Sequence, residues 1–272
     1  MLSDSEWTAL RPWLRDVEHA LADLGLPTQA QALIRIDSTN AELMRRGAAG
    51  VHTPTLLVAA HQSAGRGRLG RQWLDTPAND GTEVQPSALM ASLGMLLAPR
   101  DWSGLSLAVG LSLAENLHAE VGLKWPNDLW WRGRKLGGIL IETVPLRAQA
   151  QRWVVIGFGI NLKAPPSEGL RNPAVGLQAM CPEAAPGPTL LRLVPALAQT
   201  VLRFAQTGFA PFQPGFAARD VLAGQTVQTS DGVYGHCGGV DQDGALLLHT
   251  AHGVVRVTTS EVSVRPAARA AT

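Results

Sequence analysis

Apolar side chains predict helices in three parts of the chain, at helical spacing in the first and by length and apolar content in the other two. The first run predicts an amphipathic helix over residues 5–24, which Gly25 and Pro27 would end. Its apolar positions are Trp7, Leu10, Leu14, Val17, Leu21 and Leu24. Longer apolar stretches predict buried helices over residues 103–121 and 189–204.

Shorter apolar runs, bounded by turn residues, predict strands over residues 33–36, 55–60, 88–97 and 153–161. Residues 123–142 predict a hairpin with its turn at 132–134 and with Lys124 and Lys135 on its two arms. From Gly224 onward, short runs alternate with turns, which predicts a small β-barrel appended to a larger domain. Together these elements indicate an α+β protein.

Composition limits the class of protein. Hydrophobic residues make up 46% of the chain and charged residues 17%, so a sizeable core can form. A net charge of +1 argues against a protein built around a nucleic-acid backbone. Cys181 and Cys237 are too few for a disulfide framework, and no apolar run is long enough for a membrane span. Asp4 and Glu6 stand where a signal peptide carries positive charge, so we expect a cytoplasmic protein.

Candidate chemistry is densest in residues 65–71, where three arginines alternate with three glycines. Glycine permits unusual backbone conformations, and arginine offers a fixed fork of donors for phosphate or carboxylate. The run predicts a mobile basic loop that closes over an anionic ligand. A flexible loop without a site and an RNA-contacting segment are the alternatives. Because the run directly follows the predicted core strand at 55–60, a ligand site is favoured.

A second candidate lies at Ser38-Thr39-Asn40, which is followed by Glu42. Thr39 and Glu42 have the spacing of a capping box, so a helix is predicted to begin there. The free N–H groups of a helix start can bind an anion. Spacing alone favours the simpler interpretation, in which Ser38 and Thr39 only cap the helix.

Three further polar residues interrupt apolar strands. Lys124 is either buried at a site or packs its stem while its ammonium group reaches water. Asp128 is a metal ligand, a lysine partner or a turn former. Asn161, at the end of a predicted strand, either bonds a base edge or begins a turn. The glycines of the same strand would allow close approach by another backbone or a ligand.

In order along the chain, these segments resemble the biotin protein ligases. The matching stretches are Ser38-Thr39-Asn40, Gln62 to Trp73, Lys124-Trp125-Pro126-Asn127-Asp128, Arg134 to Glu142, and Gly157 to Asn161. The arginine–glycine run and the Lys-Trp-Pro-Asn-Asp motif are each fairly specific, and their combination is strong. The resemblance covers roughly residues 30–266.

The resemblance implies a mixed-sheet catalytic domain of the biotin/lipoate ligase type over residues 1–219, in which 1–30 form a helical extension. It also implies a small SH3-like β-barrel over 220–266, and we expect a disordered tail at 267–272. The implied reaction joins biotin to ATP, with Mg²⁺, to give biotinyl-5′-AMP. Biotin would then pass to one lysine of the biotin carboxyl carrier domain of a biotin-dependent carboxylase.

The resemblance also assigns individual residues. Lys124, Arg66 and Arg68 match the catalytic cations. Positions that match biotin contacts are Ser38, Thr39, Asn40, Gln62, Gly65, Arg66, Gly67, Arg68, Lys124 and Gly138. Positions that match ATP or adenylate contacts are Arg68, Arg71, Trp73, Asn127, Lys135, Asn161 and Arg265. Asp128 is the candidate Mg²⁺ ligand.

The chain departs from the family pattern in two places. Only one predicted helix precedes Ser38, too little for a helix-turn-helix domain, so we expect no DNA binding. Residues 75–86 form a longer link after Trp73 than is usual. Rival interpretations are a ligase for lipoate or octanoate, a biotin or nucleotide sensor, and an RNA-binding module. A monomer and a homodimer both remain open.

Overall fold

The computed structural model describes residues 10–73, 86–146, 150–166, 172–258 and 264–266. Its larger sheet has seven strands in the order β1-β2-β3-β7-β6-β5-β4. They are β1 (Gln29–Ile36), β2 (Thr55–Gln62), β3 (Ala88–Leu97), β4 (Gly122–Lys124), β5 (Asp128–Trp131), β6 (Arg134–Pro145) and β7 (Arg152–Asn161). β1 and β2 run parallel and the other neighbouring pairs are antiparallel, so the predicted mixed sheet is confirmed.

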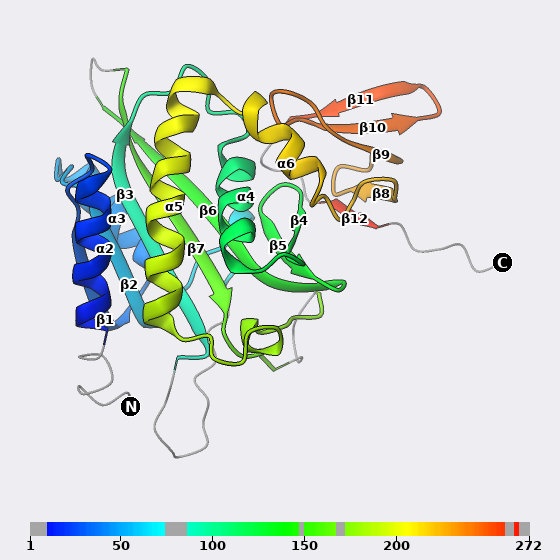
Figure 1. The fold of residues 1–272 in the computed structure, drawn as a ribbon. Coiled ribbons are helices and arrows are strands. Elements are labelled where there is room, and N and C mark those ends of the chain that lie inside the picture. The colour runs from blue at the N-terminus through cyan, green and yellow to red at the C-terminus, as the bar shows by residue number, and fades with distance from the viewer. Residues whose placement is uncertain (1–9, 74–85, 147–149, 167–171, 259–263, 267–272) are drawn as a thin grey trace.

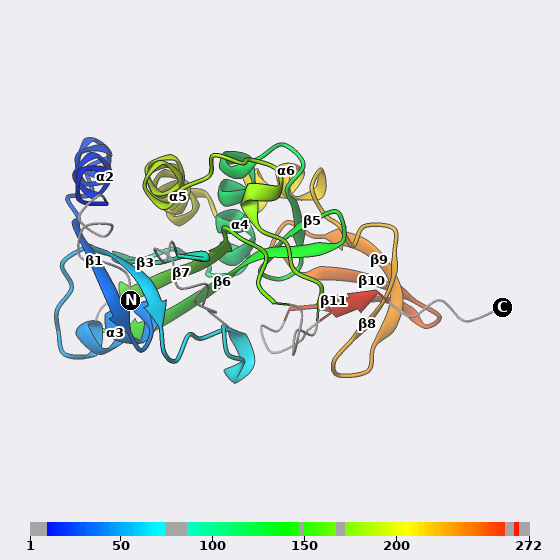
Figure 2. The ribbon, with the colours of Figure 1, turned by 90° about the horizontal axis from the view of Figure 1, so that it is seen from below.

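Helices cover both faces of this sheet. They are α2 (Arg11–Asp23), α3 (Thr39–Ala48), α4 (Leu105–Leu117), α5 (Pro186–Thr207) and α6 (Gln213–Ala217), with 3₁₀ turns at Arg68–Gly70, Leu177–Ala179 and Ala210–Phe212. Figure 1 shows α2, α5 and α4 side by side in front of the sheet, and Figure 2 shows α3 on the opposite face. β2, β3 and β7 are buried along almost their whole length, as strands covered on both faces must be.

Trp153 of β7 anchors α3 to the sheet. Its side chain is 1% exposed, and its Nε1 donates to the carbonyl oxygen of Leu43 at 2.9 Å. The indole ring packs against Gly47 of α3 and Gly94 of β3, where a Cβ atom would overlap it. This close packing fixes the position of α3, and therefore of its N-terminus, over the centre of the sheet.

The smaller sheet is wholly antiparallel, in the order β11-β10-β9-β8-β12. Its strands are β8 (Thr226–Thr229), β9 (Tyr234–Val240), β10 (Leu246–Thr250), β11 (Gly253–Val257) and β12 (Val264–Pro266). It is consistent with the predicted SH3-like unit. The indole of Trp125 donates to the carbonyl oxygen of Gly244 at 3.1 Å, which ties this sheet to the segment next to Lys124. The division of the chain at residue 220 stays a prediction.

Element boundaries differ from the predicted ones. The first helix is described over Arg11–Asp23, and residues 1–9 lie outside the described part. The first strand begins at Gln29 because its polar residues also pair with β2. α4 ends at Leu117, since the backbone of His118 is extended. The disordered tail predicted at 267–272 and nearly all of the 75–86 insertion lie outside the described residues.

The predicted turn at 132–134 is confirmed, with positive φ angles of 46° at Arg132 and 74° at Gly133 joining β5 to β6. The prediction that Lys124 lies on an arm of this hairpin is wrong. Lys124 ends β4, a separate strand that pairs with β5. Pro126 has no N–H to donate, so the chain turns at 125–127 and returns as β5.

The structure also bears on the predictions for the two cysteines and for membrane-spanning segments. Cys237 is buried and Cys181 is half-buried, and both are free thiols, as predicted. Across the part of the chain that the structure describes, no helix combines the length and the hydropathy that a membrane span requires.

Candidate functional site

One cavity of about 470 Å³ gathers most of the predicted site residues. Its walls come from the start of α3, the 65–73 loop and the 125–128 turn, and β3, β6 and β7 form its floor. The predicted residues that line it are Ser38, Thr39, Asn40, Gln62, Arg66, Gly67, Arg68, Arg71, Trp73, Lys124, Asn127, Asp128, Lys135, Gly138 and Asn161. A cavity of this size suits a small-molecule ligand.

The start of α3 does more than cap a helix. Ser38 is the N-cap, and its Oγ accepts a hydrogen bond from the amide of Ala41 at 3.4 Å. The predicted capping box between Thr39 and Glu42 is wrong, because the Glu42 carboxylate instead contacts two arginines of α3. Thr39 and Asn40 are 3% and 4% exposed and bond to residues of the sheet. Both residues line the cavity, so this helix start forms part of the cavity wall.

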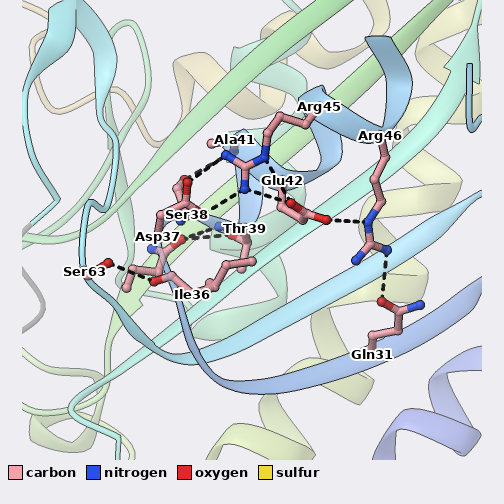
Figure 3. A network of polar contacts seen from close by, with 11 residues as sticks. Gln31, Ile36, Asp37, Ser38, Thr39, Ala41, Glu42, Arg45, Arg46 and Ser63 are labelled. Carbon is pink, nitrogen blue, oxygen red and sulfur yellow. Dashed lines mark hydrogen bonds and ion pairs between the residues drawn. The ribbon is translucent and has the colours of Figure 1, made fainter. Parts of the chain in front are cut away.

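Salt bridges on the outer side of α3 brace this helix start, as Figure 3 shows. Arg45 contacts both oxygens of Asp37, at 2.7 and 3.0 Å, and also the Glu42 carboxylate at 2.7 Å. Asp37 in turn accepts a hydrogen bond from the amide of Ser38 at 2.8 Å. The Arg45 guanidinium lowers the pKa of Asp37 to about 2. The network thus holds the residue that precedes the N-cap.

This pKa shift predicts a pH-dependent contribution to stability. The Asp37–Arg45 pair stabilises the fold fully above the unfolded pKa of Asp37, near 3.8, and less as the pH falls through about 2. Because the two side chains are 42% and 54% exposed, Asp37→Asn should cost less than about 1 kcal/mol at pH 7. Urea unfolding of both proteins at pH 7 and pH 2 measures this difference. An unchanged difference at pH 2 would contradict the assignment.

The 65–73 loop is a short hairpin that leans over the cavity. The amide of Trp73 donates to Gly65 O at 2.9 Å, and the amide of Gly67 donates to Arg71 O at 2.7 Å. Leu69 has a φ of 60°, an uncommon conformation for a residue with a side chain, and Gly70 follows with 66°. Gly65 is buried beneath Trp73, so it shapes the loop rather than lining the cavity.

Two arginines connect this loop to β6 and to the 125–128 turn. Arg66 Nη2 lies 3.1 Å from Glu142 Oε1 on β6. Arg68 Nη1 donates to Asn127 Oδ1 at 3.1 Å, and Asn127 Nδ2 donates to the carbonyl oxygen of Ile139 at 2.7 Å. Burial lowers the pKa of the Arg68 guanidinium, but guanidinium groups remain protonated at neutral pH. The loop therefore carries a fixed, partly desolvated positive charge into the cavity.

Lys124 brings a second charge. Its residue is 7% exposed, so the alternative in which its ammonium group reaches bulk water is wrong. The Nζ atom lies 4.8 Å from the ring centroid of Trp130, within the range of a cation–π contact. Lys124 thus ends β4 with its charge held inside the protein, where an anion would be attracted more strongly than in water.

The far end of the cavity is aromatic and polar. The Trp73 ring packs over Gly159 of β7, where a Cβ atom would overlap it. Asn161 Nδ2 donates to the carbonyl oxygens of Lys135 and Val175 at 3.4 and 3.3 Å. With both N–H groups directed at carbonyls, its Oδ1 can accept a bond from a ligand amino group. The β7 glycines do permit a close approach, but the groups that approach Gly157 and Gly159 are the side chains of Asn40 and Trp73, not the predicted backbone or ligand.

Asp128 pairs with Lys135, whose Nζ lies 2.7 Å from Asp128 Oδ1. Of the three interpretations of Asp128, the lysine partner is confirmed. The described residues contain no group of three or more His, Cys, Asp or Glu that could hold a metal by themselves. Mg²⁺ usually takes one or two protein carboxylates together with phosphates and water. A single carboxylate lining the cavity fits an ion that arrives with a nucleotide.

Three features were not identified from the sequence. Ser92 and Met90 on β3 lie under the cavity, and Glu142 on β6 contacts the loop. Ser92 and Glu142 gave a weak signal, a polar residue within an apolar strand, as Lys124 did. Arg265 lies on β12 next to Val264, which lines the cavity, but its side chain lies outside the described residues.

Comparisons with known proteins agree with this site. A family profile described as the Biotin/lipoate A/B protein ligase family matches residues 32–161. A biotin–[acetyl-CoA-carboxylase] ligase from Paracoccus denitrificans is 34% identical over 85% of this chain and 98% of its own. The bifunctional ligase/repressor BirA of Escherichia coli is 31% identical over 85% of this chain and 73% of its own.

The solved structures that resemble this fold include biotin protein ligases as well. The biotin protein ligase from Aquifex aeolicus, in complex with biotin and ATP, superposes with a TM-score of 0.71. It is 26% identical, and the match covers 88% of this chain and 99% of that chain. With its fold, its cavity and its relatives in agreement, the chain belongs to the biotin/lipoate A/B protein ligase family, as a biotin protein ligase.

Proposed function

We propose that the enzyme joins biotin to ATP, giving biotinyl-5′-AMP and pyrophosphate, and then transfers biotin to a lysine of a carrier domain. The observation that carries this proposal is the placement of two cations, Lys124 and Arg68, in one cavity between a polar wall and an aromatic end. The polar wall, at Thr39 and Gln62, suits the ureido ring of biotin. The other end, at Trp73, suits adenine.

The first step needs charge stabilisation rather than proton removal. Carboxylic acids titrate near pH ~4–5, so the valerate of biotin is already ionised at neutral pH. It attacks the α-phosphorus of ATP, and pyrophosphate leaves. Two anions must approach each other, and negative charge grows on the phosphoryl oxygens. Lys124 and Arg68 supply fixed cations for that charge. Mg²⁺, held by Asp128 and the phosphates, would neutralise further phosphate charge.

The nucleotide end of the cavity supports ATP as the second substrate. The Trp73 ring offers a flat apolar surface on which a base can stack. Asn161 offers an acceptor for an exocyclic amino group, such as that of adenine. Lys135, whose Nζ is 6.0 Å from the Trp73 ring centroid, also lies at this end, paired with Asp128.

The 65–73 loop would protect the product. A mixed anhydride hydrolyses when water reaches it, so exclusion of water is part of the reaction. Arg66 and Arg68 connect the loop to Glu142 and Asn127. In the second step, the carrier lysine attacks the anhydride carbonyl and AMP leaves.

The carrier is proposed from the names of relatives. The Paracoccus denitrificans and Mycobacterium tuberculosis relatives are biotin–[acetyl-CoA-carboxylase] ligases. We therefore propose the biotin carboxyl carrier domain of a biotin-dependent carboxylase as the acceptor. A cytoplasmic location, the absence of DNA binding, and the choice between monomer and homodimer stay predictions.

The transfer step is tested with a purified biotin carrier domain, biotin, ATP and Mg²⁺, followed by intact-mass measurement of the carrier. The expected product is a carrier with one biotin, and a carrier whose acceptor lysine is replaced by arginine should stay unmodified. Biotinyl-AMP formation without transfer would overturn the proposed acceptor. Modification by lipoate or octanoate instead of biotin would favour the rival ligase.

A further inference from the structure

A chain of hydrogen bonds runs beneath the cavity from Glu142 on β6 to Thr39 at the start of α3. Asn40 and Ser92 connect the two ends. Ser92 is 0% exposed and Asn40 is 4% exposed, so water does not compete for these bonds. The proposed reaction assigns no role to Ser92, and it uses Glu142 only as the partner of Arg66. Buried polar groups are costly to leave without their hydrogen-bond partners.

The contacts of Asn40 determine which group donates in each hydrogen bond of this chain. One Nδ2–H bond goes to Glu142 Oε2 at 3.0 Å and the other to the carbonyl oxygen of Leu140 at 3.1 Å. A carbonyl and an ionised carboxylate only accept, and this assigns the orientation of the Asn40 amide. Its Oδ1 then lies 2.6 Å from Ser92 Oγ. Gly157 leaves room for this amide, since a Cβ atom there would overlap Oδ1.

The same reasoning assigns the donor and acceptor roles of Ser92 and Thr39. An amide oxygen only accepts, so Ser92 donates its single hydrogen to Asn40. Ser92 Oγ must then accept from Thr39 Oγ1 at 2.7 Å. Thr39 Oγ1 also lies 3.2 Å from Gln62 Oε1, and this amide oxygen can only accept. The same oxygen accepts a hydrogen bond from the Thr39 amide at 2.7 Å. The hydroxyl hydrogen of Thr39 is therefore committed to the protein.

We propose that Glu142, Asn40 and Ser92 are positioning residues that fix the Thr39 hydroxyl as a hydrogen-bond acceptor toward the cavity. The site then selects an acid whose ring carries an N–H group, as the ureido ring of biotin does. Lipoate and octanoate have no N–H group, so the same arrangement disfavours them. This inference rests on the proposed function and deepens its substrate choice.

The test is a double-mutant cycle on biotin affinity, measured by titration calorimetry. It compares the wild type, Ser92→Ala, Thr39→Val and the double variant. Loss of one such bond is expected to raise the Kd for biotin roughly tenfold in each single variant. Because Ser92 acts through the Thr39 hydroxyl, the double variant should bind biotin no more weakly than Thr39→Val alone. The KM for ATP should stay unchanged in all four proteins.

Ser112→Ala is the matched control. Ser112 on α4 is also buried, at 4% exposure, and its Oγ has no hydrogen-bond partner among the described residues. Its loss should leave the Kd for biotin unchanged. If Ser92→Ala does not fold, Glu142→Ala replaces it in the cycle, because the Glu142 side chain lies at the outer end of the chain and is 19% exposed. Arg66→Ala is then measured beside it, since Glu142 also contacts Arg66 at 3.1 Å and the effect of losing that contact must be subtracted.

Failure of the hydrogen-bond chain and failure of the proposed function give different results. Non-additive Kd changes with a constant KM for ATP support the directed chain. Additive changes, or a rise in Kd in Ser112→Ala equal to that in Ser92→Ala, would overturn it while leaving biotin as the substrate. A wild-type protein that binds no biotin would instead overturn the proposed function.

Discussion

Replacing Lys124 with alanine is expected to slow biotin-dependent adenylate formation by about 100- to 1,000-fold. Lys124 is buried in the cavity, with its Nζ 4.8 Å from the ring centroid of Trp130, so its charge acts in a partly desolvated site. A contact that strengthens as the phosphoryl charge grows lowers kcat more than it raises KM. Single-turnover formation of labelled biotinyl-AMP measures the effect.

Lys163→Ala provides the control for Lys124→Ala. Lys163 is exposed just beyond β7 and does not line the cavity, so its replacement removes the same charge from the surface. Its adenylation rate should match that of the wild type. A Lys124→Ala protein that keeps its melting temperature and an unchanged adenylation rate would exclude Lys124 as the central cation.

Replacing Arg68 with alanine is expected to release biotinyl-AMP about 10- to 100-fold faster. Arg68 connects the loop to Asn127 by a 3.1 Å hydrogen bond and brings its charge to the adenylate. Hydrogen bonds to charged groups contribute on the order of 1.5–3 kcal/mol, which corresponds to this range of rates. Free biotinyl-AMP should accumulate in solution and hydrolyse there, because the loop no longer retains it.

A rapid-dilution experiment with labelled adenylate measures that release rate. Arg35→Ala, on the exposed edge strand β1, removes the same charge away from the cavity and should leave the rate unchanged. Arg68→Lys keeps the charge but cannot reproduce the guanidinium geometry, so an intermediate rate is expected. Equal release rates in Arg68→Ala and the wild type would show that the loop holds the product without Arg68.

Most elements of the fold could be predicted from local patterns. The long helices and the strands β2, β3 and β7 have apolar runs that match the burial they receive. β1 was predicted too short because an edge strand needs few apolar residues, and its pairing with β2 cannot be seen locally. Lys124 was assigned to the wrong strand, since the effect of Pro126 depends on how the chain continues after the turn.

The cavity residues could be predicted because they lie in motifs, but their partners could not. Glu142 and Ser92 bond to Asn40 across three different elements, and such contacts exist only after the sheet and α3 have packed together. The role of Glu42 was mistaken for a similar reason. Spacing along one helix matched a capping box, while the surrounding arginines offered stronger, charged partners.

The account is tested most directly by incubating the purified enzyme with biotin, Mg²⁺ and α-labelled ATP, without any carrier protein. The predicted result is labelled biotinyl-AMP that forms only when biotin is present and that is greatly reduced in Lys124→Ala. No labelled adenylate with biotin, or an adenylate formed with lipoate or octanoate instead, would contradict the proposed reaction.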